Sequence, residues 1–311
     1  MNSTSHTSPD GNHPNQSQGK PIAKDQPGPD KLKLAIVIGS GSAMCAASLG
    51  MWKVFRREGI EISLAVGCSG GSLYAAAIAL GYEFEAVEEM SRRMWSSDLV
   101  EGYIPNLRAA MSGEKRFTEK SGLVDDQNLL EVLQTIFGER KFSETQIPLY
   151  IVSTDLYSGE SVLHESGRIL DAVRASAAIP MIFAPWQVEG RWLVDGAVSN
   201  PLPIDVAIRE GAGLIAAMGF ELPTRSRMRS YTAVTSHFNS IYMNNILKSR
   251  FAFYNAVHHA EIIPILPDFD RPVGGFDGYQ VPYLIEKGAQ ATEERLPYIR
   301  RLLASGEANV P

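Results

Sequence analysis

Cysteine is nearly absent from this 311-residue chain, which contains only Cys45 and Cys68, both in apolar stretches rich in glycine and serine. Two such thiols cannot build the disulfide framework of a small secreted domain, which favours a reducing, cytoplasmic compartment. The sequence also lacks an H-E-x-x-H motif, a metal-type cysteine spacing and a tight carboxylate cluster. We therefore expect no metal site and no other cofactor.

Positive charge is in short supply as well, because 29 lysines and arginines stand against 35 aspartates and glutamates, a formal net charge of -6. Proteins that bind nucleic acid rely on clustered cations, so the chain is not expected to bind DNA or RNA. With 44% hydrophobic and 21% charged residues, it has the composition of a globular protein that can bury a full core. An uncharged or lipid substrate is compatible with this charge balance.

Large apolar residues are rare in residues 1–31, which are rich in Ser, Asn, Gly, Pro, Gln and His. Such a segment cannot bury enough surface to order itself, so we predict a disordered tail there, one domain at 32–305 and a short tail at 306–311. Residues 34–52 and 62–82 carry no charge, and each run is long enough to cross a bilayer. Their glycine and serine content favours a buried α/β core, and the polar residues ahead of the first run argue against an export signal.

Strand-like and helix-like patterns alternate along the chain. Strands are predicted at residues 34–38, 62–66, 149–154, 214–219 and 262–266, with a short edge strand at 162–163 and a hairpin at 186–194. Helices are predicted at residues 45–58, 72–80, 83–94, 126–137, 169–178 and 201–210, whereas residues 98–122 look irregular. This alternation predicts an α/β fold with a doubly wound sheet.

The second uncharged run contains Gly67-Cys68-Ser69-Gly70-Gly71, a match to G-x-S-x-G, between a predicted strand and an alanine-rich helix. A sharp strand-to-helix turn holds a serine hydroxyl clear of its own backbone, and small neighbours let the turn close. Ser69 is therefore a candidate nucleophile. The alternative is a tight connection in which Ser69 only caps the helix.

A second glycine-rich loop, Gly39-Ser40-Gly41-Ser42, follows the first predicted strand and opens a helix. It does not complete the dinucleotide motif G-x-G-x-x-G, because Met44 stands where the third glycine is needed, so nucleotide binding is not expected. Its backbone N–H groups are instead suited to an oxyanion hole, the partner of an exposed serine nucleophile. Two consecutive parallel strands would place this loop beside Ser69.

Two further stretches complete a pattern, since residues 171–180 read DAVRASAAIP and residues 193–203 read LVDGAVSNPLP. With the loop at 39–50 and the turn at 67–71, in this order, they resemble the patatin-like phospholipases, a family of serine acylhydrolases that use a Ser-Asp dyad. The resemblance covers roughly residues 34–303. It implies a three-layer α/β/α fold with a mostly parallel central sheet, and an enzyme that needs no cofactor.

By this resemblance Ser69 is the nucleophile and Asp195 is its base, because a carboxylate held against a serine hydroxyl can take the proton without a histidine. The implied oxyanion donors are Gly41, Ser42 and Gly70, and the other motif glycines are Gly39, Gly67, Gly71 and Gly196. The implied function is a lipid acyl hydrolase of phospholipase, lysophospholipase or esterase type. It would cleave carboxylic ester bonds of a lipid or a small ester through an acyl-enzyme.

The chain departs from the family's pattern at one place. The oxyanion loop of the family usually carries Arg followed by Gly, and the aligned positions here are Met44 and Cys45. Backbone donors would survive this change, so activity could persist. The departure nevertheless keeps a second function open, a catalytically weakened lipid-binding or regulatory protein with the same fold.

A catalytic triad of the α/β-hydrolase type is the other rival, because Ser69, Asp195 and either His258 or His259 follow the chain order Ser, Asp, His. Only one predicted strand precedes the strand that leads into Ser69. The α/β-hydrolases place several strands before their nucleophile, which favours the dyad.

Residues 224–260 contain five cations and no acid, in a chain that is acidic overall. The same stretch contains aromatic residues at Tyr231, Phe238, Tyr242, Phe251, Phe253 and Tyr254. Cations beside amphipathic aromatics suit the interface of an anionic membrane, where lipid substrates would be found. Peripheral membrane contact through residues 224–260 is one hypothesis; the alternatives are that the aromatics face the core while the cations solvate the outer surface, or that the patch binds another subunit.

Overall fold

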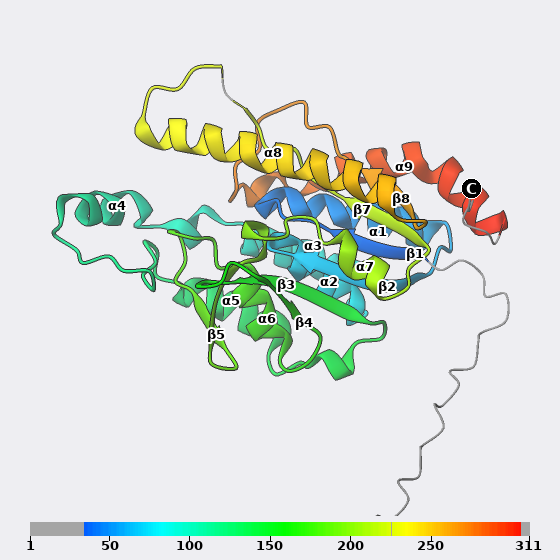
Figure 1. Cartoon of the computed structure of the whole chain (residues 1–311), viewed down its shortest axis with the longest axis horizontal. Coiled ribbons are helices and arrows are strands. Elements are labelled where there is room, and N and C mark those ends of the chain that lie inside the picture. The colour runs from blue at the N-terminus through cyan, green and yellow to red at the C-terminus, as the bar shows by residue number, and fades with distance from the viewer. Residues whose placement is uncertain (1–33, 225, 306–311) are drawn as a thin grey trace, which may run out of the picture. The chain divides into compact units, whose positions relative to one another are not determined.

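A central β-sheet with helices on both faces is present in the computed structural model, which describes residues 34–224 and 226–305 (Figure 1). Within these residues the sheet has eight strands: β1 (Leu34–Ile38), β2 (Ile62–Cys68), β3 (Leu149–Asp155), β4 (Ser161–His164), β5 (Trp186–Val188), β6 (Arg191–Asp195), β7 (Leu214–Met218) and β8 (Glu261–Ile265). The tails predicted at residues 1–31 and 306–311 lie outside the described residues, and so does Arg225.

Parallel pairing dominates the sheet, whose strand order is β5-β6-β3-β2-β1-β7-β8, with β4 alongside β3. The strands β8, β7, β1, β2 and β3 are parallel neighbours, whereas β4 and β6 run antiparallel to β3. In β1, Leu34 and Ile36 face one apolar core, and Ala35 and Val37 face another. A strand buried on both faces must be apolar throughout, as these sequences are. The predicted α/β fold with a mostly parallel sheet is confirmed.

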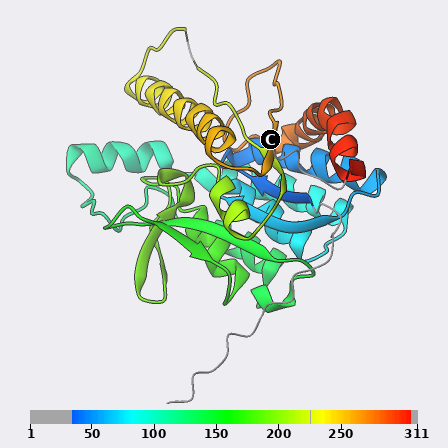
Figure 2. The same ribbon diagram turned by 45° about the vertical axis from the view of Figure 1, so that its right-hand side comes forward.

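The helices divide between the two faces of the sheet, as both views show (Figures 1 and 2). The described residues form α1 (Ala47–Arg57), α2 (Gly70–Ala79), α3 (Phe84–Met94), α4 (Tyr103–Ser112), α5 (Gln127–Phe137), α6 (Ile169–Ser176), α7 (Ile204–Arg209), α8 (Tyr231–Val257) and α9 (Val281–Ser305). Residues of α1, α2, α5 and α9 belong to the first core, and residues of α7 and α8 belong to the second. The sheet therefore lies between two helical layers, which is the three-layer arrangement expected from the sequence.

Three helices depart from the sequence-based expectation. The prediction that residues 98–122 are irregular is wrong where α4 forms, because Gly102 and Gly113 stand at its two ends with φ of 81° and 79°. Glycine at a helix end supplies a left-handed conformation and does not break the helix. The helices α8 and α9 were not predicted from the sequence.

The two uncharged runs form strand-turn-helix units, in which β1 precedes α1 and β2 precedes α2. No helix among residues 34–224 and 226–305 combines the length and the apolarity that a bilayer crossing requires. The helix α1 packs closely on α9 at two glycines, since a Cβ atom on Gly288 would lie 1.8 Å from the carbonyl oxygen of Ala47. This contact holds α9 against the helix that follows the glycine-rich loop.

Candidate active site

Ser69 lies at the sharp turn between β2 and α2, and its backbone has φ of 54° and ψ of -130°. A residue other than glycine rarely adopts a positive φ, and such conformations cluster at functional sites. The flanking glycines have no room for a side chain: a Cβ atom on Gly67 would lie 2.5 Å from Cα of Ser72, and one on Gly71 would lie 2.4 Å from the carbonyl oxygen of Ile38. The turn is therefore packed against the end of β1.

The hydroxyl group of Ser69 donates a hydrogen bond to Oδ2 of Asp195 at 2.7 Å. Both residues are buried, with 5% of Ser69 and 3% of Asp195 exposed. The other carboxylate oxygen, Oδ1, accepts a hydrogen bond from the backbone N–H of Ala197 at 2.8 Å. The carboxylate of Asp195 thus accepts one hydrogen bond from the Ser69 hydroxyl and one from the backbone of Ala197.

The strand β3 brings the two residues together although they are 126 positions apart. Its residues up to Val152 pair with β2, where Val152 lies opposite Cys68, and its residues from Ser153 pair with β6, where Ser153 lies opposite Asp195. The strand β4 pairs with β3 both before and after the point where the partner of β3 changes from β2 to β6. Since β4 occupies one edge of β3 there, β2 and β6 lie end to end along the opposite edge. Asp195, at the end of β6, therefore lies next to the carboxyl end of β2, where Ser69 follows.

Burial raises the pKa of Asp195 to about 6, because a charged carboxylate loses its hydration in this apolar surrounding. The hydrogen bonds from Ser69 and Ala197 favour the charged form and oppose this effect. Asp195 is also fixed through its backbone, since Thr154 Oγ1 donates to its carbonyl oxygen at 2.9 Å. Its own N–H donates to the carbonyl oxygen of Ala178 at 3.0 Å.

Ser176, the last residue of α6, contacts the backbone of the nucleophile. The N–H group of Ser69 donates to Oγ of Ser176 at 2.8 Å, and that hydroxyl donates to the carbonyl oxygen of Val152 at 2.6 Å. Ser176 is fully buried. Sequence reasoning assigned it no role, although it lies in the stretch DAVRASAAIP on which the resemblance rests.

The glycine-rich loop lies beside the turn, as two consecutive parallel strands predict. A Cβ atom on Gly70 would lie 2.9 Å from the carbonyl oxygen of Ser42. Among the described residues, the N–H groups of Gly41, Ser42 and Gly70 donate to no other group, whereas the N–H of Ala43 donates to the carbonyl oxygen of Gly275. Two of these donors, on Ser42 and Gly70, belong to residues that line a pocket together with Ser69.

The other motif glycines are also at points of close contact. A Cβ atom on Gly39 would lie 2.9 Å from the carbonyl oxygen of Pro201, and one on Gly196 would lie 2.2 Å from that of Val152. Met44 is only 5% exposed and belongs to the first core. An arginine at this position would place an unpaired cation among apolar side chains, so the loop is built for an apolar residue there.

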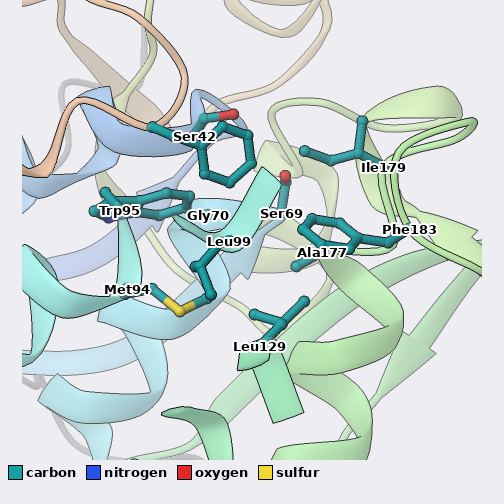
Figure 3. Close-up of a pocket in the computed structure, with 11 residues that line it drawn as sticks. Ser42, Ser69, Gly70, Met94, Trp95, Leu99, Leu129, Ala177, Ile179 and Phe183 are labelled. Carbon is teal, nitrogen blue, oxygen red and sulfur yellow. The ribbon is translucent and has the colours of Figure 1, made fainter. Parts of the chain in front are cut away.

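A narrow apolar pocket opens at Ser69. Its walls come from segments far apart in the sequence, and the large side chains are Met94, Trp95, Leu99, Leu129, Phe183 and Phe276. Figure 3 shows the labelled side chains among these arranged around the hydroxyl group of Ser69. The ring of Phe276 contacts those of Trp95 and Phe183, with centroids 6.2 and 6.3 Å apart. The pocket suits an apolar group of a ligand that lies against Ser69.

The histidines of the rival triad lie elsewhere. His258 and His259 are between α8 and the start of β8, so they lie at the amino-terminal edge of the parallel strands, whereas Ser69 follows the carboxyl end of β2. In the described part of the chain no histidine forms a hydrogen bond with Ser69 or Asp195. His164 is buried and bonds Ser153 at 2.7 Å, and burial lowers its pKa to about 4. The geometry therefore does not form the triad.

A metal-binding cluster is also not found in the described residues, where no three His, Cys, Asp or Glu side chains are placed to share an ion. The two cysteines are free and buried on either side of the turn. Burial raises the pKa of both thiols well above the ordinary value, so both stay protonated.

Comparisons with known proteins identify the family of this chain. The family model described as patatin-like phospholipase matches residues 36–208. An uncharacterized NTE family protein of Mycobacterium tuberculosis is 30% identical over 189 residues, which are 59% of this chain and 48% of the relative. Neuropathy target esterase sws of Drosophila melanogaster is 25% identical over 187 residues, which are 60% of this chain and 13% of that protein. This chain thus spans half or less of the length of these curated relatives.

Among solved structures, VipD from Legionella pneumophila matches with a TM-score of 0.47 and 12% sequence identity, over 89% of this chain and 67% of that one. ExoU, a type III effector, matches with a TM-score of 0.40. The family match spans β1 to α7 and so contains the glycine-rich loop, the turn at Ser69 and Asp195. On this match, the chain belongs to the patatin-like phospholipase family.

Proposed function

We propose that the protein is a lipid acyl hydrolase that cleaves carboxylic esters through an acyl-enzyme on Ser69, with Asp195 as the base. The observation that carries the proposal is the 2.7 Å hydrogen bond from Ser69 Oγ to a buried carboxylate, at the mouth of an apolar pocket. Family members are serine acyl hydrolases, which gives the coarse class. The dyad geometry supports the finer assignment.

In the first half of the reaction, Asp195 takes the proton of the Ser69 hydroxyl while Oγ attacks the ester carbonyl carbon. The carbonyl oxygen becomes an oxyanion, and the N–H groups of Gly41, Ser42 and Gly70 are the proposed donors to it; Ser42 and Gly70 line the pocket at Ser69, which supports this role. One such donor contributes about 3 to 4 kcal/mol to the transition state. The tetrahedral adduct then expels the alkoxide, which takes the proton from Asp195.

In the second half, Asp195 accepts a proton from water while the water oxygen attacks the acyl-enzyme. Collapse of this second adduct releases the fatty acid and returns the proton to Ser69. Asp195 serves both steps because its carboxylate is fixed by Ala197 and by its own backbone contacts. The acyl group would occupy the apolar pocket, and the leaving group would lie toward its mouth.

A catalytically weakened lipid-binding protein is the second candidate function, favoured by a single observation. Met44 and Cys45 stand where the family usually has Arg and Gly, and both are buried, so no cation from this loop reaches the oxyanion position. The backbone donors remain, which is why we place hydrolysis first.

Labelling with a fluorophosphonate separates the two candidates, because the reagent forms a stable adduct only with an activated serine. We expect an adduct on a peptide that contains Ser69, no adduct in Ser69→Ala, and strongly reduced labelling in Asp195→Asn. His258→Ala and His259→Ala should label like the unmodified protein. A folded protein that binds lipid but carries no adduct would support the second candidate function. Loss of labelling in either histidine variant would favour the Ser-Asp-His triad.

Peripheral membrane contact through residues 224–260 is a separate proposal. It does not depend on catalysis, and the structure allows a sharper form of it.

A further inference from the structure

The long helix α8 has an exposed face that is apolar. It has 27 residues, and Leu247 and Tyr254 bury its inner face in the second core. The opposite side exposes a row of large apolar residues, here called the aromatic stripe: Tyr231, Phe238, Tyr242, Ile246, Phe253 and Val257. They are 37% to 69% exposed. Steps of four and seven residues keep them on one side of the helix.

The sequence expectation for this segment is thus partly corrected. Phe251 and Tyr254 face the core, as the alternative had it, whereas Tyr231, Phe238 and Tyr242 are exposed. A continuous exposed row of this kind is uncommon on a soluble surface and marks a site of interaction. The remaining question is which partner it fits.

Charge around the stripe favours an anionic partner. Residues 226–260 contain no Asp or Glu. Arg227 and Arg229 lie just before the first turn of α8, are exposed, and form no ion pair with any described residue. Lys248 pairs with Glu221, and Arg250 points inward and donates to the carbonyl oxygen of Ser199 at 3.0 Å. The unpaired cations therefore stand at the amino-terminal end of the stripe.

The amino-terminal part of the stripe lies at the same edge of the sheet as the candidate active site. Leu247 packs on Gly219, which follows the last residue of β7, so the part of α8 before Leu247 lies beyond the carboxyl edge of the sheet. Ser69 and the glycine-rich loop project from the same edge. Both views show α4 projecting at this end as well (Figures 1 and 2). The helix α4 has no buried residue and exposes Ile104 and Met111.

We propose that the aromatic stripe, with Arg227 and Arg229, docks on the surface of an anionic lipid bilayer and turns the mouth of the Ser69 pocket toward the lipid. An amphipathic helix binds such a surface by lying in its plane, with the apolar face among the acyl chains and the cations at the headgroups. A symmetric pair of protein copies fits less well, because it would pair two surfaces that carry cations and no acid. The docking itself does not depend on the proposed catalysis. The role we give it, which is to present the Ser69 pocket to lipid substrate, rests on the proposed function.

Sedimentation with vesicles tests the docking directly. The full chain, carrying Ser69→Ala to prevent turnover, is mixed with phosphatidylcholine vesicles containing a rising fraction of phosphatidylserine. We expect binding to increase with the anionic fraction and to weaken as salt rises. The double variant Arg227→Glu and Arg229→Glu should bind roughly tenfold or more weakly, and so should Phe238→Ser with Tyr242→Ser.

Matched controls separate docking from general charge and general surface apolarity. Arg295→Glu with Arg301→Glu makes the same charge change on α9, on the other face of the sheet, and Tyr157→Ser removes an equally exposed ring outside the stripe. Both controls should bind within about twofold of the parent. Binding that ignores the anionic fraction, or equal losses in controls and stripe variants, would overturn the proposal.

Two further measurements distinguish membrane docking from the proposed catalytic function and from a subunit interface. In the chain with intact Ser69, the stripe variants should hydrolyse a soluble short-chain ester at the parent rate and lose activity only on vesicle-borne substrate. If no ester is cleaved while vesicles still bind, the proposed function fails and docking stands. If light scattering shows a dimer that the stripe variants convert to monomer, the stripe is a subunit interface and the docking proposal is wrong.

Discussion

In the proposed mechanism, Asp195 acts as a base from a position that disfavours its charge. The carboxylate is 3% exposed, and burial raises its pKa from 3.8 to about 6. A base whose pKa lies near the working pH is a better proton acceptor than an ordinary aspartate. The single hydrogen bond to Ser69 therefore joins a poised base to a nucleophile without a histidine between them.

Activity should fall on the acid side as Asp195 takes up a proton. Because the folded-state pKa is raised, the charged form that accepts the Ser69 proton predominates only above about pH 6. We expect kcat/KM for a soluble ester to decrease toward tenfold per pH unit below that value. The rate of fluorophosphonate labelling should decrease over the same pH range. If both rates decreased only near pH 4, with the protein still folded, Asp195 would titrate like an exposed carboxyl group.

Ser176 should act as a positioning residue. In Ser176→Ala the N–H of Ser69 loses its acceptor, and an unsatisfied buried donor costs about 1 to 3 kcal/mol. The strained turn should relax, so we expect kcat to fall roughly ten- to hundredfold with little change in KM. Ser176→Thr keeps the hydroxyl and should restore part of the rate.

The control for Ser176 is another fully buried helical serine. Ser91→Ala removes a hydroxyl that donates to the carbonyl oxygen of Val87 at 2.6 Å, away from the dyad. It should lower the melting temperature by a similar amount and leave kcat unchanged. Equal loss of kcat in both variants would show that Ser176 acts only through stability.

Among the elements, the pair α1 and α9 shows how a distant helix supports the glycine-rich loop. Gly50 and Gly288 let the two backbones approach, since a Cβ atom on Gly50 would lie 2.0 Å from the carbonyl oxygen of Ile285. The 3-10 turn at Ser42–Ala46 leads directly into α1. Displacement of α1 by α9 would thus move the loop that carries the candidate oxyanion donors.

Gly288→Ala should destabilise the protein, because its new methyl group cannot avoid the backbone of Ala47. Overpacking of this kind costs about 1 to 3 kcal/mol, which lowers the melting temperature by several degrees. Gln290→Ala, on the exposed side of α9, is the matched control and should melt like the parent. Thermal unfolding followed by circular dichroism measures both. An unchanged melting temperature for Gly288→Ala would show that α9 can move away freely.

At the scale of the whole molecule, the pocket is the feature that no single segment determines. Its walls come from α3, from α5, from the segment after α6 and from the loop before α9. On the proposed function, these walls together limit the acyl group that can lie beside Ser69. Chain-length preference is therefore a property of the assembled fold.

Leu129→Ala should shift the preference toward longer acyl chains, because Leu129 lines the pocket and its loss lengthens the apolar space. We expect the optimum in a series of p-nitrophenyl esters to move to longer chains. The control is Leu133→Ala, one turn further along α5 and fully buried but outside the pocket. Both variants should lose about 2 to 5 kcal/mol of stability. A shift in both, or in neither, would contradict the assignment of the pocket to the acyl chain.

The sequence by itself determined the class of fold, and its resemblance to a family singled out Ser69 and Asp195 as the proposed dyad, because the signals that carry both are local. Strand and helix periodicity, the G-x-S-x-G turn and the LVDGA stretch each span a few consecutive residues, and the backbone pattern of each follows from its own glycines and apolar positions. It did not reveal Ser176, the pocket walls or the exposed side of α8. Those depend on which distant segments meet across the sheet, and α4, α8 and α9 take their form from packing and end geometry that their local patterns do not express. The tertiary structure decided them because a contact between remote residues becomes favourable only when both chain segments are already held in place.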